Sequence, residues 1–335
     1  MKIIIPMAGI GSRLKPHTLT IPKPLTKIAG KPIVQRLVED IAGVLNQKIE
    51  EVCFIIGPNF PKDTEERLNN IAKSLDTKGI IVVQKEALGT AHAIYQAKQS
   101  LQGPCVVAFA DTLFKANFTL NAEADGAIWV KKVADPSAYG VIKLKGGVIT
   151  DFIEKPIEFV SDLAIIGIYY FKKGEDLRTE IAYLLDNNIT ENGEFQLTNA
   201  LESLKQKGAK FVPGEVSDWM DCGNKAITIK TNTSVLQYAL KDKENLVAKN
   251  VILENAKIIE PCYIGDNVVL KNSTIGPNVS LGMNSVITNS KINNSLIQEE
   301  VTINNADLTD SMIGNKVSFN GEFTSVSIGD FSVLE

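Results

Sequence analysis

Histidine, cysteine and tryptophan are scarce in this 335-residue sequence, which contains two, four and two of them. The cysteines are Cys53, Cys105, Cys222 and Cys262. None stands in C-x-x-C spacing, so neither a zinc site nor a disulfide framework is indicated. No apolar run approaches the length that crosses a membrane, and Pro6 interrupts the apolar start too early for a secretion signal. We therefore expect a cytoplasmic protein with reduced thiols.

Positive charge is not in excess either, because the formal net charge is −4. The balance argues against a broad basic surface for nucleic acid or an anionic membrane. A phosphate-bearing partner would have to meet a few local cations, which suits a small nucleotide. The chain is long enough for two domains.

The first half of the sequence alternates apolar strands with helices, which predicts an α/β, Rossmann-like domain. The expected strands are Lys2–Pro6, Val52–Ile56, Ile80–Gln84 and Cys105–Ala110, with helices at 31–47, 62–76 and 89–101 between them. Ligands of such sheets bind beyond the carboxyl ends of the strands, so residues after Pro6, Gln84 and Ala110 should line one cleft. Strands with short turns follow over 127–171, then helices at 174–187 and 195–207, which makes the sheet mixed.

After Asn250 the composition changes, since arginine and tryptophan disappear and 13 of the last 86 residues are asparagine. Aliphatic residues recur every five or six positions, at Ile252, Ile258, Ile264, Leu270, Ile275, Leu281, Ile287, Ile292, Ile297, Ile303, Leu308 and Ile313. A hexapeptide period with one inward aliphatic residue per short strand is typical of a parallel β-helix. We expect a catalytic domain at 1–241 and a β-helix domain at 242–335.

Many hexapeptide β-helices are acyltransferases that use a histidine as general base. No histidine follows His92 in this sequence. We therefore favour a scaffold that assembles a homo-oligomer over a second active site in this domain.

A glycine loop at residues 9–11 follows the first strand, and such loops bring backbone N–H groups close to phosphate. A dinucleotide fingerprint needs glycine where Leu14 stands and an acidic residue where Gly57 ends the second strand. A Walker A loop needs Gly-Lys-Ser/Thr, which is absent. The pattern G-x-G-[ST]-R followed by P-K-x-L, found here at 9–13 and 22–25, favours a nucleotidylyltransferase loop.

With these motifs the chain resembles the sugar-1-phosphate nucleotidylyltransferases, or nucleotide-sugar pyrophosphorylases. It is most similar to the long form of glucose-1-phosphate thymidylyltransferase, which carries a C-terminal left-handed β-helix. The segments that carry the resemblance are GIGSRLKPHT at 9–18, PKPL at 22–25, GKPI at 30–33, LGTAHAI at 88–94, FADT at 109–112, YGV at 139–141, FIEKP at 152–156, IIGIYYF at 165–171, GEFQLT at 193–198 and WMDCGN at 219–224. One departure is Ala8, where many members have glycine and the UTP-using branch has alanine.

The resemblance implies a role for each matching residue. Nucleotide binding falls to Ala8, Gly9, Gly11, Ser12, Arg13, Gln84, Gly89 and Thr90. Binding of the sugar phosphate falls to Gly140, Glu154, Lys155, Gly167 and Thr198. The catalytic set is Arg13, Lys23, Asp111 and Asp221, in which the two aspartates hold Mg²⁺. These roles compete with plainer ones, such as surface cations, capping or turn aspartates and an exposed Glu-Lys turn.

The chemistry gives these roles a physical reason. Two polyanions must approach, so cations such as Arg13 and Lys23 lower the barrier where charge grows on the α-phosphorus. Carboxylates are the hard oxygen ligands that Mg²⁺ prefers. The amide of Gln84 can pair with a pyrimidine edge, and the carboxylate of Glu154 can accept two sugar hydroxyls. His92 is expected to be structural, because a phosphate monoester is already an ionised nucleophile.

The reaction that the resemblance implies transfers a nucleotidyl group from a nucleoside triphosphate to a sugar 1-phosphate and releases pyrophosphate. The first expectation is dTTP with glucose 1-phosphate, giving dTDP-glucose. UTP with glucose 1-phosphate and GTP with mannose 1-phosphate are alternatives. A regulatory relative that binds nucleotide sugar without catalysis is the alternative class.

Overall fold

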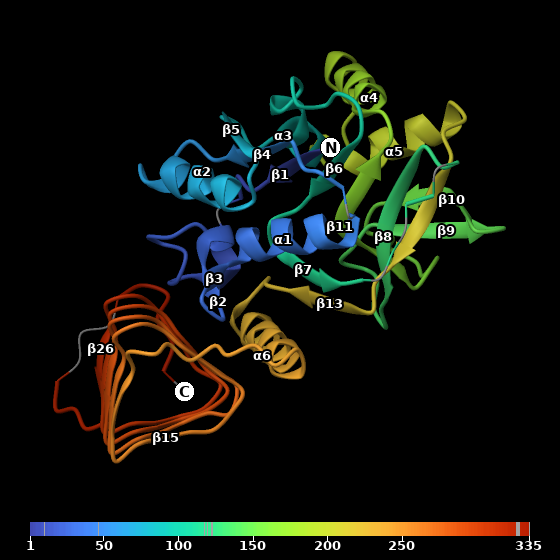
Figure 1. The fold of residues 1–335 in the computed structure, drawn as a ribbon. Helices are drawn as coiled ribbons and strands as arrows, with labels where there is room; N and C mark the ends of the chain where they lie inside the picture. Colours follow the sequence, from blue (N-terminus) through green and yellow to red (C-terminus); the bar gives the residue numbers. More distant parts are fainter. Residues whose placement is uncertain are drawn as a thin grey trace. The chain divides into compact units, whose positions relative to one another are not determined.

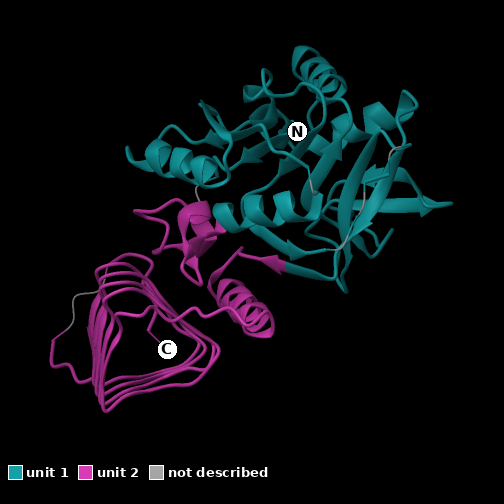
Figure 2. Ribbon diagram, in the orientation of Figure 1, with its two compact units in different colours: residues 1–10, 34–219 teal, residues 11–33, 220–335 magenta. Residues whose placement is uncertain are grey.

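The computed structural model describes residues 1–334 apart from 10, 46, 117, 119, 122 and 326–328. The chain divides into two compact units (Figure 2). The first, called the sheet unit here, comprises residues 1–10 and 34–219. The second, called the β-helix unit, comprises residues 11–33 and 220–335, so it includes most of the glycine loop and the PKPL segment.

The sheet unit is built on a mixed sheet, as predicted (Figure 1). Its parallel strands, in spatial order, are β5 (Lys78–Val83), β4 (Glu51–Ile56), β1 (Lys2–Pro6) and β6 (Cys105–Ala108). Strand β11 (Leu163–Phe171) pairs antiparallel with β6 and continues the sheet. Beyond it lie the hairpin β9 (Val141–Lys145) with β10 (Val148–Ile153), and the strands β8 (Gly126–Lys132) and β12 (Phe211–Glu215).

Helices cover this sheet because each presents an apolar stripe to it. They are α1 (Ile33–Leu45), α2 (Thr64–Ser74), α3 (Thr90–Gln96), α4 (Gly174–Asp186) and α5 (Leu197–Gln206). In α1 the buried residues Val34, Leu37, Val38 and Ile41 follow helical spacing. One apolar core joins strand residues such as Ile4 and Val107 to helix residues such as Leu201.

Several predicted boundaries were wrong by a few residues. The helix expected at 31–47 begins at Ile33, because Lys31–Pro32 forms strand β3 and pairs with β2 (Lys27–Ile28). Helix α3 ends at Gln96 and not at residue 101. Strand β6 ends at Ala108, two residues early, and a further strand, β7 (Thr112–Lys115), follows Asp111.

The C-terminal coils form three stacked parallel sheets, which is the arrangement of a parallel β-helix and is consistent with the left-handed form (Figure 1). The first sheet contains β14 (Ile252–Glu254), β17 (Val269–Lys271), β20 (Val286–Thr288), β23 (Thr302–Asn304) and β26 (Ser318–Asn320). The second contains β15 (Lys257–Ile258), β18 (Thr274–Ile275), β21 (Lys291–Ile292) and β24 (Asp307–Leu308). The third contains β16 (Cys262–Ile264), β19 (Val279–Leu281), β22 (Leu296–Ile297) and β25 (Met312–Ile313).

The aliphatic repeat stacks inside these coils. Leu270, Ile287 and Ile303 lie in register on neighbouring strands and are fully buried. The prediction that Ile252 begins this stack was wrong. Leu253 is the residue in register with Leu270, and both Ile252 and Leu253 are about half exposed, because β14 is the first strand of its sheet.

Helix α6 (Lys225–Lys241) belongs to the β-helix unit and is capped by the side chain of Asn224, which accepts a hydrogen bond from the Ile227 N–H. The buried Asn232 accepts a hydrogen bond from Ser280 at 2.6 Å. Among the described residues, no helix is both long and apolar enough to cross a membrane.

Candidate active site

The glycine loop and the PKPL segment meet in the β-helix unit. Gly11 has a left-handed φ of +66° and precedes a 3₁₀ turn at Ser12–Leu14. The hydroxyl of Thr18 donates a hydrogen bond to the Gly11 carbonyl at 2.8 Å. A Cβ atom at Gly11 would stand 3.0 Å from Cβ of Lys23, so glycine is required by both the conformation and the space.

Lys23 opens a second 3₁₀ turn, Lys23–Leu25, and is only 7% exposed. Lysine is almost never so deeply buried unless its ammonium group meets a partner, and a buried lysine is a sign of a functional role. Ser12 and Arg13 are exposed, as groups that meet an incoming ligand would be. The two segments therefore combine a buried cation, Lys23, with an accessible cation, Arg13.

Ala8 and Gly9 follow β1 in the sheet unit. The Met7 N–H donates to the Ile55 carbonyl at 2.9 Å, which fixes the end of β1 against β4. A Cβ atom at Gly57 would lie 3.0 Å from the Ala8 carbonyl oxygen, whereas one at Gly9 would meet nothing within 4 Å. Among the described residues no contact therefore demands glycine at position 9, and the space beside it is open.

The predicted base-reading residues form a connected group in the sheet unit. Gln84 follows β5 and is buried, and its amide nitrogen donates to the Gly89 carbonyl at 3.4 Å. The same nitrogen lies 3.2 Å from Nδ1 of His92. The other ring nitrogen of His92 lies 3.2 Å from the Gln96 amide, so this imidazole orients Gln84.

Gly89 and Thr90 are held by the GEFQLT segment. Gly89 has a φ of +110°, and a Cβ atom there would lie 2.5 Å from the Phe195 carbonyl oxygen. The Thr90 hydroxyl donates to Gln196 at 3.2 Å and accepts from the Leu197 N–H at 2.9 Å. Gln196 was missed as a supporting residue, although its segment belonged to the recognised motifs.

The predicted sugar-binding residues form a second group in the same unit. The Thr198 hydroxyl donates to Oε2 of Glu154 at 3.2 Å. A Cβ atom at Gly140 would lie 3.1 Å from that same oxygen, and the Gly140 carbonyl accepts from the Ile165 N–H at 2.8 Å. Glycine at position 140 therefore lets the carboxylate approach the backbone.

Burial raises the pKa of the Glu154 carboxyl above its ordinary value, against the opposing effects of Lys155 and the Thr198 hydrogen bond. Lys155 is more than half exposed, and its Nζ lies 3.8 Å from Glu154. Glu191 and Glu194 add negative charge that also raises this pKa, and sequence reasoning had not connected them with Glu154. The carboxylate is thus held close to a cation in a partly desolvated place.

Gly167 links this group to the strand that precedes Asp111. Its φ is +83°, and its carbonyl accepts a hydrogen bond from the Phe109 N–H at 2.9 Å. A Cβ atom at Gly167 would press on the Phe109 ring at 3.3 Å. Glycine here lets β11 approach the end of β6 closely.

The two aspartates expected to hold a metal end separate elements. Asp111 follows β6 in the sheet unit, and Asp221 is the last residue of β13 (Asp218–Asp221) in the β-helix unit. The Thr231 hydroxyl donates to the Asp221 carbonyl at 2.5 Å, and a Cβ atom at Gly223 would stand 2.7 Å from the Asp221 carboxylate. Both aspartates are partly accessible.

Among the residues that the structure describes, no three His, Cys, Asp or Glu side chains gather as metal ligands. Two carboxylates suit Mg²⁺, which takes few protein ligands and completes its shell with water and phosphate oxygens. The donor chemistry of Asp111 and Asp221 therefore fits this ion.

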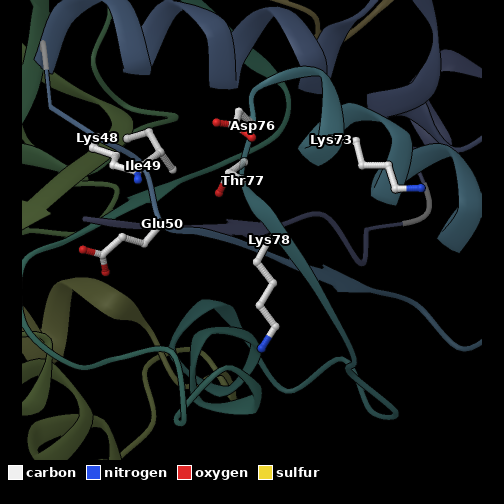
Figure 3. Close-up of a pocket in the computed structure, with 7 residues that line it drawn as sticks. All are labelled: Lys48, Ile49, Glu50, Lys73, Asp76, Thr77 and Lys78. Carbon is white, nitrogen blue, oxygen red and sulfur yellow. The ribbon is translucent and has the colours of Figure 1, made fainter.

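A hollow of the sheet unit lies at the opposite ends of the strands and is distinct from these groups (Figure 3). It is lined by Lys48, Ile49, Glu50, Lys73, Asp76, Thr77 and Lys78, next to the first residues of β4 and β5. Figure 3 shows the Lys73 and Lys78 side chains extending in different directions. They do not converge on one anion, so the candidate site stays at the carboxyl ends of the strands.

The chain matches the family model described as nucleotidyl transferase over residues 2–238. It is 30% identical over 271 residues to the bifunctional protein GlmU of Methanococcus maripaludis, covering 78% of this chain and 62% of that protein. It is 35% identical over 190 residues to the Drosophila melanogaster mannose-1-phosphate guanylyltransferase catalytic subunit beta, covering 54% and 50%.

A solved structure of a nucleoside-diphosphate-sugar pyrophosphorylase from Vibrio cholerae shares the fold. Its TM-score is 0.60 at 22% identity, covering 69% of this chain and 99% of that one. The chain spans about three fifths of the length of the GlmU relative. The match over most of the chain defines the class of protein: the chain belongs to the nucleotidyl transferase family.

Proposed function

We propose that this protein joins a nucleoside monophosphate unit from a nucleoside triphosphate to a sugar 1-phosphate and releases pyrophosphate. The observation that carries the proposal is the packing of the family's glycine loop on the PKPL segment, where a Cβ atom at Gly11 would stand 3.0 Å from Cβ of the buried Lys23. A loop of this kind holds a phosphate chain against backbone N–H groups while the cation offsets its charge.

The reaction is a single in-line displacement. An oxygen of the sugar phosphate attacks the α-phosphorus, the bond from that phosphorus to the bridging oxygen breaks, and pyrophosphate leaves with the electron pair. Lys23 and Arg13 hold the phosphates in line and offset the charge that grows there. No protein base is required, because the attacking oxygen is already ionised at neutral pH.

Mg²⁺ held by Asp111 and Asp221 would supply further charge neutralisation at the phosphate oxygens. The position of Asp111 after a sheet strand, and of Asp221 at the end of β13, supports this role.

Sugar selection falls to the group around Glu154 and Thr198, with Gly140 and Gly167 giving room for the sugar and Lys155 meeting its phosphate. The Glu154 carboxylate, close to the backbone of Gly140, can accept hydrogen bonds from two adjacent hydroxyls. Gln84, Gly89 and Thr90 would read the base, with Ala8, Gly9 and Ser12 beside the phosphates. Because a glutamine amide matches the donor and acceptor on a pyrimidine edge, dTTP with glucose 1-phosphate is the leading pair.

The proposal divides the chain into a catalytic domain at 1–241 and a β-helix domain at 242–335 that assembles copies of the chain. UTP with glucose 1-phosphate and GTP with mannose 1-phosphate are the competing substrate pairs. The mannose pair gains support from the similarity to the guanylyltransferase subunit.

A matrix of pyrophosphate-release assays tests the proposal. Each of dTTP, UTP and GTP is combined with glucose 1-phosphate and with mannose 1-phosphate in the presence of Mg²⁺. We expect release only when both substrates are present, and fastest with dTTP and glucose 1-phosphate. Release from the triphosphate alone, or from none of the six pairs, would contradict the proposal.

A further inference from the structure

Residues 11–25, called the catalytic loop, belong to the β-helix unit together with its coils. Lys23 is followed by the hairpin of β2 and β3, residues 27–32, and the Ile33 N–H closes it by donating to the Thr26 carbonyl at 3.0 Å. The Thr26 N–H in turn donates to the Lys23 carbonyl at 3.0 Å. Two backbone hydrogen bonds thus connect the hairpin to Lys23. A contact that holds the hairpin in place, called a fixed point below, therefore also holds Lys23.

The first fixed point is an ion pair with the β-helix. Nζ of Lys27 lies 2.5 Å from Oε1 of Glu299, and both side chains are only about one third exposed. The neighbouring Gln298 is buried and donates from its amide to the Lys27 carbonyl at 3.1 Å. Two adjacent residues of one coil thus hold both the side chain and the backbone of Lys27.

The second fixed point is the tip of the hairpin. Gly30 has a φ of +81°, and a Cβ atom there would lie 2.3 Å from the Tyr263 ring. Tyr263 lies on β16 of the β-helix. The aromatic ring therefore rests directly on the backbone of the tip.

The third fixed point lies on the other limb of the loop, beyond Arg13. A Cβ atom at Gly314 would stand 3.7 Å from Nδ1 of His17, so this imidazole lies over a glycine of the β-helix. Burial, and then the charge of Lys225, lower the pKa of His17. The ring is therefore held neutral against the coil.

From these contacts we infer that the β-helix positions the catalytic loop, with Glu299, Gln298 and Tyr263 as positioning residues for Lys23 and Gly11. The inference rests on the proposed function, since it takes the loop to be the triphosphate site. A misplacement of about 1 Å can cost a reaction about a hundred-fold, so a loop without a core of its own gains from an external support. The β-helix then acts on the chemistry and not only on assembly.

Binding of inorganic tripolyphosphate to the full-length protein, measured by calorimetry with Mg²⁺, tests the inference without reference to base or sugar. Glu299→Lys removes the ion pair and places two cations face to face. We expect about ten-fold weaker binding. Simple long-range attraction predicts the opposite sign, because the substitution adds positive charge to the protein.

Glu300→Lys is the matched control, since it makes the same charge change one residue away. The carboxylate of Glu300 lies 3.9 Å from Nζ of Lys316 in the next coil, and this ion pair does not involve the loop. We expect unchanged or slightly tighter binding. The double variant Lys27→Glu/Glu299→Lys, which reverses the pair, should bind within about three-fold of wild type. Glu299→Gln, which keeps the shape of the side chain, replaces Glu299→Lys if lysine prevents folding, with about three-fold weaker binding expected.

The outcomes separate the two proposals. If wild type binds tripolyphosphate and Glu299→Lys binds as tightly as Glu300→Lys, the positioning role is wrong and the proposed function stands. If wild type does not bind tripolyphosphate, the phosphate role of the loop is wrong, and the positioning role falls with it. Weaker binding by Glu299→Lys alone, restored in the double variant, supports the inference.

Discussion

Polar side chains serve different ends in the sheet unit and in the β-helix unit. In the β-helix, asparagine amides stack from coil to coil, as in the ladder Asn255, Asn272, Asn289, Asn305 and Asn320, with donor–acceptor distances from 2.9 to 3.5 Å. In the sheet unit, Gln84, Glu154 and Thr198 lie after strand ends or at a helix start, where Gln84 meets His92 and Glu154 meets Thr198. A polar side chain that recurs in every coil forms hydrogen bonds with its equivalents in the neighbouring coils. A polar side chain that occurs once, at a strand end, can instead bind a ligand.

Glycines in the candidate nucleotide and sugar groups, and asparagines at the corners of the coils, adopt left-handed backbone conformations. Gly89 and Gly167 do so in the sheet unit, and close neighbours leave no space for a Cβ atom there. At the β-helix corners asparagines such as Asn272 and Asn289 do so instead, at φ values of 46° and 49°. Asparagine tolerates this region and adds the ladder hydrogen bond. Substitutions at these glycines should therefore harm activity, and substitutions at the corner asparagines should harm stability.

The largest expected effect is the loss of catalysis in Lys23→Ala and in Asp111→Ala. Each removes one preorganised charged group, which is worth about 3 kcal/mol, or about a hundred-fold in kcat. Pyrophosphate-release rates measure the change. Unfolding curves of the same variants serve as the control, and wild-type turnover by purified Asp111→Ala would refute its metal role.

Glu154→Gln should separate activity from stability within one residue. We expect kcat/KM to fall about ten- to a hundred-fold, because charge-assisted hydrogen bonds to the sugar are lost. Steady-state kinetics with varied sugar 1-phosphate measures this change, and kcat/KM for the sugar 1-phosphate is the quantity that should fall.

The same variant should be more stable than wild type at neutral pH. The folded pKa of Glu154 lies above its ordinary value of 4.5, so the folded protein binds this proton more tightly than the unfolded chain. Its contribution to stability is full below pH 4.5 and is lost as the pH rises through the folded pKa. In urea titrations, the difference in the free energy of unfolding between Glu154→Gln and wild type should therefore increase from acid to neutral pH. An equal gain at every pH would contradict the burial argument.

In the β-helix, Asn289→Ala should lower stability and leave catalysis intact. It breaks two ladder hydrogen bonds and puts alanine at a positive φ, with an expected cost of about 2 kcal/mol. Asn289→Gly, which accepts that φ, should cost about 1 kcal/mol.

Both tryptophans belong to the sheet unit, Trp129 within it and Trp219 as its last residue, so their fluorescence follows mainly that unit. We expect Asn289→Ala to shift the transition seen by circular dichroism more than the transition seen by fluorescence. Equal shifts would mean that the two units unfold as one block.

The smallest effect is expected from thiol reagents. All four cysteines are buried, and burial raises the pKa of Cys105 to about 12 and those of Cys53 and Cys262 to about 11. They should react slowly at neutral pH in the native protein and rapidly in denaturant. Because Cys53 and Cys105 report on the sheet unit and Cys262 on the β-helix, their native rates show which unit opens more readily. Fast labelling of Cys262 alone would indicate a loosely closed coil.

Much of the fold could be predicted from the sequence because its signals are periodic. The aliphatic repeat from Ile264 to Ile303 predicted the stacked coils, and the apolar strands predicted the sheet. The errors lie where the local conformation of a few residues overrides the periodic pattern. Lys31 and Pro32 read as the start of a helix, yet the turn at Ala29 and Gly30 pairs them with Lys27 and Ile28. The prediction for Ile252 was wrong because the first strand of a stack has no preceding strand to set its register.

Of the candidate site, the sequence indicated the residues but not what supports them. Gln196 beneath Thr90 and Glu191 near Glu154 lie far along the chain from their partners, and no local spacing joins them. The pairing of Lys27 with Glu299 spans 272 residues between two segments that look unrelated. Such contacts depend on tertiary packing, so only the structure identifies them.

The most direct test of the central claim is the rate of pyrophosphate release by the full-length protein with and without sugar 1-phosphate. With dTTP, glucose 1-phosphate and Mg²⁺, we expect steady release that stops when the sugar phosphate is omitted and falls about a hundred-fold in Lys23→Ala. Equal release without the sugar phosphate, or unchanged release in Lys23→Ala, would contradict the account.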